Sequence, residues 1–333
     1  MEHVAIDVGG RESQICVRSA DGTIVEERRI PTRSLPPYLA RRPKSRVVLE
    51  TCAESFGLAD AALSSGHEVR VVPATLVRTL GVGARRLKTD RRDAQLLSEV
   101  STRIDLPSVH IPSATSRALK ALCNSRDVLV ASRTKLVNHV RGWLRAGAHR
   151  LRTGSPKTLP ARVRELEVAI PEHIDRVLLV LDVLSVQLRH AEAELMKLAR
   201  EDDVCRRLMT VPGVGPVTAV RFMAAIDKVE RFDNAHAVES YFGLVPGEFS
   251  SSDRQHRLSI TKAGAVTVRW TLVQAAWCCR RIRPADPISR WSYEVEKRRG
   301  KGIAVVALAR KLAGVLYALW RDGSTYDPRR GAA

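Results

Sequence analysis

The stretch Leu87-Lys88-Thr89-Asp90-Arg91-Arg92-Asp93-Ala94 places two carboxylates three residues apart, with basic residues around them. Residues at this spacing are neighbours on one side of a helix. Neighbouring carboxylates repel unless a cation neutralises them, and Mg²⁺ binds through one or two carboxylates together with waters and phosphate oxygens. Lys88, Arg91 and Arg92 suit a polyanionic substrate. Taken alone, the stretch also fits an exposed helix start with mixed charges, so the other acids of the chain must decide.

Two further acids stand at the ends of apolar runs that are typical of buried strands. Asp7 follows Val-Ala-Ile, and Glu50 follows Val-Val-Leu. An acid in such a run is costly to bury unless it is paired or binds a metal. Four unrelated acids would need separate explanations. One Mg²⁺ site accounts together for Asp7, Glu50, Asp90 and Asp93.

The order of the expected elements indicates the fold of residues 1–105. Three strand patterns come first, and they are followed by strands and helices in alternation. This order fits an α/β domain of the RNase H-like (RuvC-like) type, in which two strand ends and a final helix meet at one edge. The four acids are expected to converge there. The strands are expected at residues 4–9, 14–18, 23–25, 46–50 and 68–73, and the helices at 53–65 and 90–102.

Residues 112–200 are expected to form a helical linker. One helix includes Arg126–Asn138, and a second carries a heptad pattern of apolar residues. Such a pattern predicts a coiled coil, either as a hairpin with the first helix or as a seam between two protomers. A buried helix in an all-α domain is the alternative. The two heptad positions are Ile174, Leu181, Leu188 and Leu195, and Val177, Leu184, Ala191 and Leu198.

Residues 201–325 are expected to form a mainly α C-terminal domain. Pro212-Gly213-Val214-Gly215 between two helices has the form of a helix-hairpin-helix turn, whose glycines let the backbone approach a phosphate. A plain helical corner has the same form. Tyr241–Asp253 contains a run of serines that offers a nucleophile beside cations, although its spacing alone favours a solvated turn. The candidate phosphate contacts of this domain are Gly213, Gly215, Arg254, His256, Arg257, Lys262, Lys297, Arg298 and Arg299.

The net charge of +19 and the pI near 10.4 indicate a nucleic-acid partner. Residues 1–105 carry only +3 and the remainder carries +16, so the later part is expected to hold most of that partner. A basic membrane-surface protein would need an amphipathic anchor helix, and neither that nor a long apolar span is evident. The six scattered cysteines form no CxxC pair. With no signal peptide expected, the protein is placed in the cytoplasm with reduced thiols, associated with the nucleoid.

The pieces together resemble the DEDD transposases of the insertion sequence 110 family over essentially the whole chain. Those proteins join a RuvC-like nuclease domain, a helical linker and a C-terminal transposase domain that contains a serine. The resemblance puts the family's acidic tetrad on Asp7, Glu50, Asp90 and Asp93. The stretches that carry it are Ala5–Gly9, Leu49-Glu50, Lys88–Ala94, Arg126–Asn138, Val211–Ala219 and Gly243–Gly264.

The resemblance puts the family's reactive serine on Ser251. That serine usually precedes a glycine and follows an aromatic residue by two positions, as Ser251 follows Phe249. Here Ser252 stands where glycine is common, so Ser250 and Ser252 remain alternatives. The stretch Thr261-Lys262-Ala263-Gly264-Ala265 also has alanine where the family often has asparagine.

The resemblance implies that the chain is a transposase that cuts and rejoins DNA with Mg²⁺ and a covalent serine–DNA link. It also implies a structured noncoding guide RNA that selects the DNA, both the element ends and the target. The long separation of tetrad and serine implies a site assembled across domains, in a homo-oligomer (dimer or tetramer). The alternatives are a Holliday-junction-type nuclease in which water attacks, an actin-like ATPase and a non-catalytic nucleic-acid-binding protein. The ATPase would need a second Asp-x-Gly loop, and none is evident.

Overall fold

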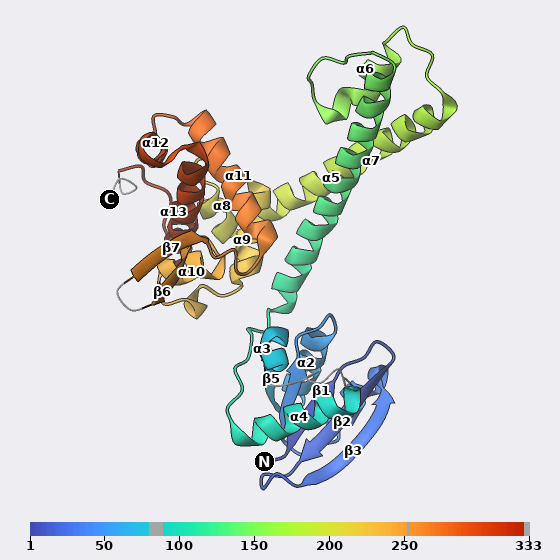
Figure 1. Cartoon of the computed structure of the whole chain (residues 1–333), viewed down its shortest axis with the longest axis vertical. Helices are drawn as coiled ribbons and strands as arrows, with labels where there is room; N and C mark the ends of the chain where they lie inside the picture. Colours follow the sequence, from blue (N-terminus) through green and yellow to red (C-terminus); the bar gives the residue numbers. More distant parts are fainter. Residues whose placement is uncertain (80–88, 252–253, 330–333) are drawn as a thin grey trace. The chain divides into compact units, whose positions relative to one another are not determined.

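A computed structural model describes the chain as two compact units, Met1–Pro112 and Ser113–Ala333 (Figure 1). The described residues are 1–79, 89–251 and 254–329, with the backbone alone for 78–79, 250–251 and 254–257.

The first unit is built on a five-stranded mixed sheet with the order β3-β2-β1-β4-β5. The pairs β1–β2 and β2–β3 are antiparallel, whereas β1–β4 and β4–β5 are parallel. This sheet and its helices fit the predicted RNase H-like domain. The strands are β1 His3–Asp7, β2 Glu12–Arg18, β3 Ile24–Pro31, β4 Arg46–Glu50 and β5 Glu68–Val72.

Helices cover both faces of this sheet. Helices α1 (Leu35–Ala40) and α2 (Ser55–Ser64) pack on one face, against alternate strand residues such as Ile6 and Leu49. The residues between these, such as Ala5 and Val48, belong to the opposite cluster, with side chains of α3 (Ala74–Thr79) and α4 (Asp90–Arg103). Successive side chains of a strand point to opposite faces of the sheet. Alternate residues of each strand therefore pack against α1 and α2, and the residues between them pack against α3 and α4.

Helix α1 lies outside the expected helices at 53–65 and 90–102, and it contains Pro36 and Pro37. Both prolines lie in the first turn of the helix, where a missing N–H costs nothing and the fixed φ is helical. Leu35 and Leu39 are fully buried in the cluster beneath the helix. Burial of these two leucines therefore stabilises the packing of this short helix on the sheet.

The second unit begins with two long helices that pack along each other, α5 (Ala114–Ala146) and α7 (Glu172–Glu201). The first heptad position of α7 is buried within the chain, at Ile174, Leu181, Leu188 and Leu195. The second heptad position is only half-buried, at Val177, Leu184, Ala191 and Leu198. The pairing is therefore intrachain along the first position, and the coiled coil itself remains a prediction. Helix α6 (Leu159–Arg164) adds Leu159 and Val163 to the shared core.

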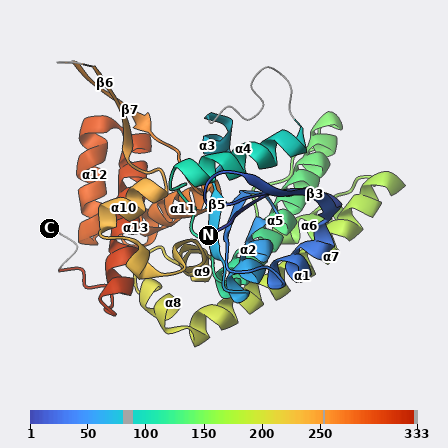
Figure 2. The same cartoon turned by 90° about the horizontal axis from the view of Figure 1, so that it is seen from below.

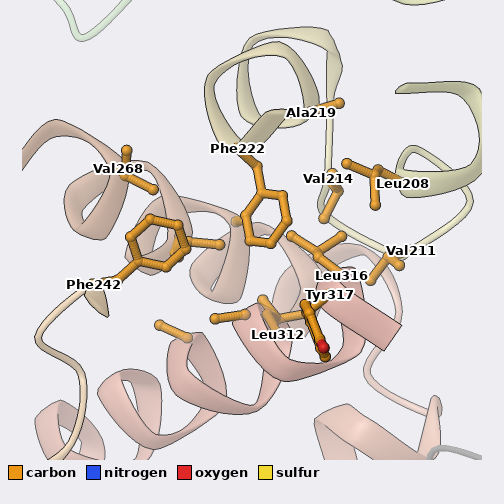
Figure 3. Packing of buried hydrophobic residues seen from close by; sticks show 14 of the residues in the cluster. Leu208, Val211, Val214, Ala219, Phe222, Phe242, Val268, Leu312, Leu316 and Tyr317 are labelled. Carbon is orange, nitrogen blue, oxygen red and sulfur yellow. The ribbon is translucent and has the colours of Figure 1, made fainter. Parts of the chain in front are cut away.

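The rest of the second unit is mainly helical around one apolar core (Figure 3). Phe222 and Phe242 meet at its centre, with ring centroids 5.6 Å apart. The elements are α8 Asp203–Leu208, α9 Pro216–Ile226, α10 Ala235–Tyr241, β6 Pro246–Ser251, β7 Arg254–Ile260, α11 Val266–Ile282, α12 Pro287–Arg299 and α13 Lys301–Arg321.

Helix α13 is long and apolar enough to cross a membrane by length and composition, although Arg310 and Lys311 interrupt its apolar residues. Half of its most apolar window is buried inside the unit. Leu312, Leu316 and Tyr317 point into the core, and the Tyr317 hydroxyl donates to the Phe232 carbonyl at 2.6 Å (Figure 3). Its hydropathy is that of a core helix.

The turn between α8 and α9 contains Gly213 at φ +86°. A Cβ on Gly213 would lie 2.4 Å from the Ala275 carbonyl oxygen and 2.6 Å from the Cys279 nitrogen, both in α11. A Cβ on Gly215 would meet nothing within 4 Å. Close packing against α11 is thus sufficient reason for glycine at 213, and phosphate binding by this turn remains a prediction.

Candidate active site

Asp7 and Glu50 stand at the carboxyl ends of two neighbouring parallel strands. The register pairs Ile6 with Leu49, and the next residues along β1 and β4 are the two acids. Alternation puts both on the face of Ala5 and Val48, which is the face that α4 covers. Both are partly buried. The register therefore places these two residues next to each other at one edge of the sheet, and their convergence with Asp90 and Asp93 stays a prediction.

Helix α4 runs antiparallel to β1, so its first turn lies toward the same edge. Ser101 near its end hydrogen-bonds His3 at the start of β1, at 2.7 Å. Leu97 packs in one cluster with Ala5. Asp93 precedes Leu97 by one turn, roughly 6 Å along the helix. Asp7 lies beyond Ala5 by a similar advance, roughly 6.6 Å along the strand.

The first turn of α4 suits acidic residues. Thr89 caps the helix, and its side chain accepts a hydrogen bond from the Arg92 nitrogen at 3.4 Å. Carboxylates near a helix N-terminus are stabilised by its partial positive charge. Asp93 is 3% exposed, whereas Asp90 is exposed. Asp7, Glu50 and Asp93 are thus buried or partly buried, whereas Asp90 is exposed to solvent.

Polar contacts hold α4 across the sheet. Glu27 on β3 accepts from Arg91 Nε at 2.6 Å and Nη2 at 2.7 Å, and from Gln95 at 3.0 Å. The hydrogen bond from Arg91 lowers the pKa of Glu27. Ser98 accepts from Arg18 on β2 at 3.0 Å. Arg91, predicted as a phosphate contact, is therefore already paired within the chain, and it helps to orient the helix that carries the acids.

The donor chemistry of this edge fits a hard cation. All four predicted ligands are carboxylates, and oxygen donors are those that Mg²⁺ prefers. Asp7 and Asp93 already have polar or electrostatic partners within the protein. Within residues 1–79, 89–251 and 254–329, no three His, Cys, Asp or Glu side chains are close enough together to hold a metal ion. Metal binding at this edge therefore remains a proposal that rests on donor type and on the convergence of the strand ends with α4.

The predicted serine lies at the end of a β-hairpin rather than in a loop or solvated turn. Strands β6 and β7 pair antiparallel, with Ser251 opposite Arg254, and Figure 2 shows the hairpin extending beyond the helices of the second unit. Ser252 lies outside the described residues. The side chains of Ser250, Ser251, Arg254, His256 and Arg257 also lie outside them.

Two glycines close the base of this hairpin. Gly243 has φ +65°, and a Cβ on it would lie 2.3 Å from the Ala263 nitrogen. Gly264 has φ +68°, and a Cβ on it would lie 2.0 Å from the Tyr241 carbonyl oxygen. Arg269 donates to the carbonyls of Phe242 and Ala263 at 2.9 and 2.8 Å. The base is thus held by backbone in close contact.

The other predicted phosphate contacts lie mostly on the surface. Lys262 is exposed at φ +56°, and Arg92 is exposed on α4. Lys88 lies outside the described residues. The last turn of α12 exposes its three basic residues, of which Lys297 pairs with Glu294 at 2.8 Å. These three are Lys297, Arg298 and Arg299.

Sequence reasoning missed two features. Glu27 accepts a hydrogen bond from Arg91 on α4, which is 64 residues away in the chain. A local sequence pattern cannot predict a contact between residues so far apart. On α11, Trp270 and Trp277 stand seven residues apart and are exposed, a spacing that places both on one side of a helix. The spacing of these two tryptophans in a basic chain could have indicated an exposed aromatic surface from the sequence alone.

Comparison with known proteins gives two matching family models. One, described as "Transposase IS116/IS110/IS902 family", matches residues 205–290. The other, a transposase model of the IS110 DEDD type, matches residues 4–147. The first covers the hairpin with Ser251, and the second covers all four acids.

Curated relatives are similar over most of the chain. The transposase for insertion sequence element IS1111A of Coxiella burnetii is 27% identical over 332 residues, covering 97% of this chain and 90% of the relative. The putative transposase y4qE of Sinorhizobium fredii is 30% identical over 295 residues, covering 80% and 73%. The transposase for insertion sequence element IS1328 of Yersinia enterocolitica is 25% identical over 330 residues, covering 97% and 98%.

Proposed function

This chain belongs to the IS110 family of insertion-sequence transposases, and from that premise we propose how it acts on DNA. It cuts and rejoins DNA strands with Mg²⁺ held by the acidic edge and with Ser251 as nucleophile. The observation that supports the acidic edge most is the register of β1 and β4, which sets Asp7 beside Glu50 under the helix that carries buried Asp93.

Asp7, Glu50, Asp90 and Asp93 would hold the metal. When bound, Mg²⁺ supplies charge stabilisation at the scissile phosphate. Thr89 and the contacts of Glu27 hold the first turn of α4 in place for this. Asp90, on the solvent side of that turn, is the acid with most freedom to turn toward the phosphate.

Ser251 would supply the covalent step. Its Oγ forms a bond to phosphorus, its proton passes to water, and the displaced DNA oxygen leaves as a hydroxyl. A second DNA hydroxyl then displaces Ser251 from the phosphorus, so the bond energy is conserved and no nucleotide triphosphate is needed. The rigid base at Gly243 and Gly264 supports the end of the hairpin from which this serine acts.

The partners would be DNA at the element ends and the target, together with a structured guide RNA. The charge of residues 106–333, +16 of the total +19, supports a large polyphosphate partner. The basic last turn of α12 and the turn at Gly215 would contribute backbone contacts. The chain would act as a dimer or tetramer in the cytoplasm, since tetrad and serine belong to different units.

The test is a denaturation-resistant protein–DNA adduct, formed with Mg²⁺, element-end DNA and the flanking transcript. Wild type forms the adduct, and Asp93→Asn abolishes both cleavage and adduct. Ser251→Ala abolishes the adduct, whereas Ser250→Ala and Ser252→Ala retain it. Asp105→Asn is the matched acid control, because Asp105 is 71% exposed and pairs with Arg70 away from the edge.

The outcomes separate the alternatives. Cleavage without an adduct in Ser251→Ala means that water attacks, as in a junction nuclease. Cleavage that persists in Asp93→Asn rules out the acidic edge as the metal site. RNA that copurifies with wild type and protects a defined sequence from nuclease supports the guide, and its absence in an active preparation rules the guide out.

A further inference from the structure

One side of α11 presents a line of stacking and cationic groups. Trp270, Gln274, Trp277 and Arg281 recur at helical spacing, and all four are exposed. Trp270 is 57% exposed and Trp277 is 38% exposed. Residues seven apart are separated by roughly 10.5 Å along a helix. The two indole rings thus form a platform on the surface of the second unit, where α11 is labelled in Figure 1.

A cavity of about 620 Å³ opens beside this platform. Its volume lies within the range of small-molecule sites. Trp277 and Tyr293 line it, and three of its lining side chains are cationic, namely Arg280, Arg281 and Lys301. This combination of aromatic and cationic groups is the chemistry that recognises a base together with its phosphate.

Arg280 carries a donor that the protein leaves unsatisfied. The residue is 4% exposed, and its Nη1 has no hydrogen-bond partner in the structure. Nη2 pairs with Glu296, and the guanidinium stacks on the Tyr293 ring, 4.3 Å from its centroid. A buried guanidinium nitrogen without a partner is costly. An anion in the cavity that Arg280 lines would remove that cost.

We propose that the Trp270–Trp277 face of α11 and the adjoining cavity bind a single-stranded segment of nucleic acid. Bases stack on the two indoles, and a backbone phosphate is held by Arg280, Arg281 and Lys301. Lys301 already lies 5.1 Å from the Trp277 ring centroid, so phosphate charge and base face are recognised at the same place. A second protein would gain little from three cations around one cavity, whereas a phosphate gains from each. The inference rests on the proposed function only in taking nucleic acid as the partner.

The test measures binding of the full chain to fluorescein-labelled 12-mers of dT and U and to a 12-base-pair duplex, by anisotropy over a salt series. Trp277→Ala weakens single-strand binding by about 5- to 150-fold, as loss of one stacked base does. Trp277→Phe restores most of it. Arg281→Gln reduces the salt slope for single strands by roughly 0.7.

Matched controls lie on α12. Trp291 is 36% exposed under Lys311, and Arg290 is exposed, but neither lines the cavity. Trp291→Ala and Arg290→Gln should bind as wild type does. The exposed positions Trp277 and Arg281 are chosen because replacing buried Arg280 would also disturb its pair with Glu296.

Comparison of dT with U identifies the kind of single strand that binds. Tighter binding of dT assigns the site to DNA, tighter binding of U assigns it to RNA, and equal binding assigns it to either strand without preference; all three support the site. Equal losses in Trp277→Ala and Trp291→Ala, or equal losses for duplex and single strand, overturn it. If cleavage proves independent of Asp93 while Trp277-dependent binding persists, the proposed mechanism fails and this site stands.

Discussion

Replacement of Gly243 tests whether the hairpin that carries Ser251 depends on a close backbone contact. Gly243→Ala introduces a Cβ that would lie 2.3 Å from the Ala263 nitrogen and 2.4 Å from its oxygen, at φ +65°. The left-handed conformation costs alanine about 1 kcal/mol. An overlap of this size with backbone atoms forces a shift that costs about 2 kcal/mol more.

The control isolates the second contribution. Gly323 has nearly the same φ, +62°, but a Cβ there would meet nothing within 4 Å. Gly323→Ala therefore loses only the conformational contribution. For a unit of this size, about 1 kcal/mol shifts the Tm by roughly 2–4 °C. We expect a fall of roughly 2–4 °C for Gly323→Ala and roughly 6–12 °C for Gly243→Ala.

Calorimetry of both variants measures the difference, and the adduct assay measures its consequence for Ser251. Gly243→Ala should lose adduct formation at temperatures where it is still folded, because the hairpin base has moved. Gly323→Ala should keep it. Equal Tm shifts in the two variants would show that the contact with Ala263 does not hold the hairpin base.

Three further predictions concern stability and reactivity. Asp127→Asn leaves buried Arg221 without the carboxylate that it meets at 2.7 Å. In a denaturant titration, this variant should lower the unfolding free energy of the second unit by about 2–3 kcal/mol. The control Asp182→Asn removes an exposed ion pair and should cost under about 1 kcal/mol in the same titration. Burial and the charge of Arg46 lower the pKa of His3, so the unfolded chain takes up the proton first and the unfolding free energy of the first unit should fall as pH drops through about 6.5. His3→Gln should show a smaller fall, and an identical pH profile would exclude His3 as the cause. Burial raises the pKa of the Cys205 thiol to about 12, so iodoacetamide at pH 8 should modify Cys205 only after denaturant is added, as mass spectrometry would detect.

Four of the five strands of the first unit were predicted close to their bounds because their signals are local, whereas β3 (Ile24–Pro31) runs well beyond the expected 23–25. The apolar runs that predicted them depend on neighbouring residues alone. The helix at Pro36 was missed, because its position depends on burial of Leu35 and Leu39 under a sheet formed by distant segments. The hairpin at Ser251 was missed for the same kind of reason, since its base is closed by contact between Gly243 and Ala263.

The sequence by itself determined which chemical groups this protein offers. It showed carboxylates at two strand ends and in one helix start, a serine beside cations, and an excess of positive charge in the later part, because these depend on residue type and local period. The tertiary structure alone decided how individual side chains are used. It paired Arg91 with Glu27, packed Gly213 against α11, left Trp277 exposed and left one nitrogen of buried Arg280 without a partner. Burial and partnership arise from contacts between distant residues, and no local pattern contains them.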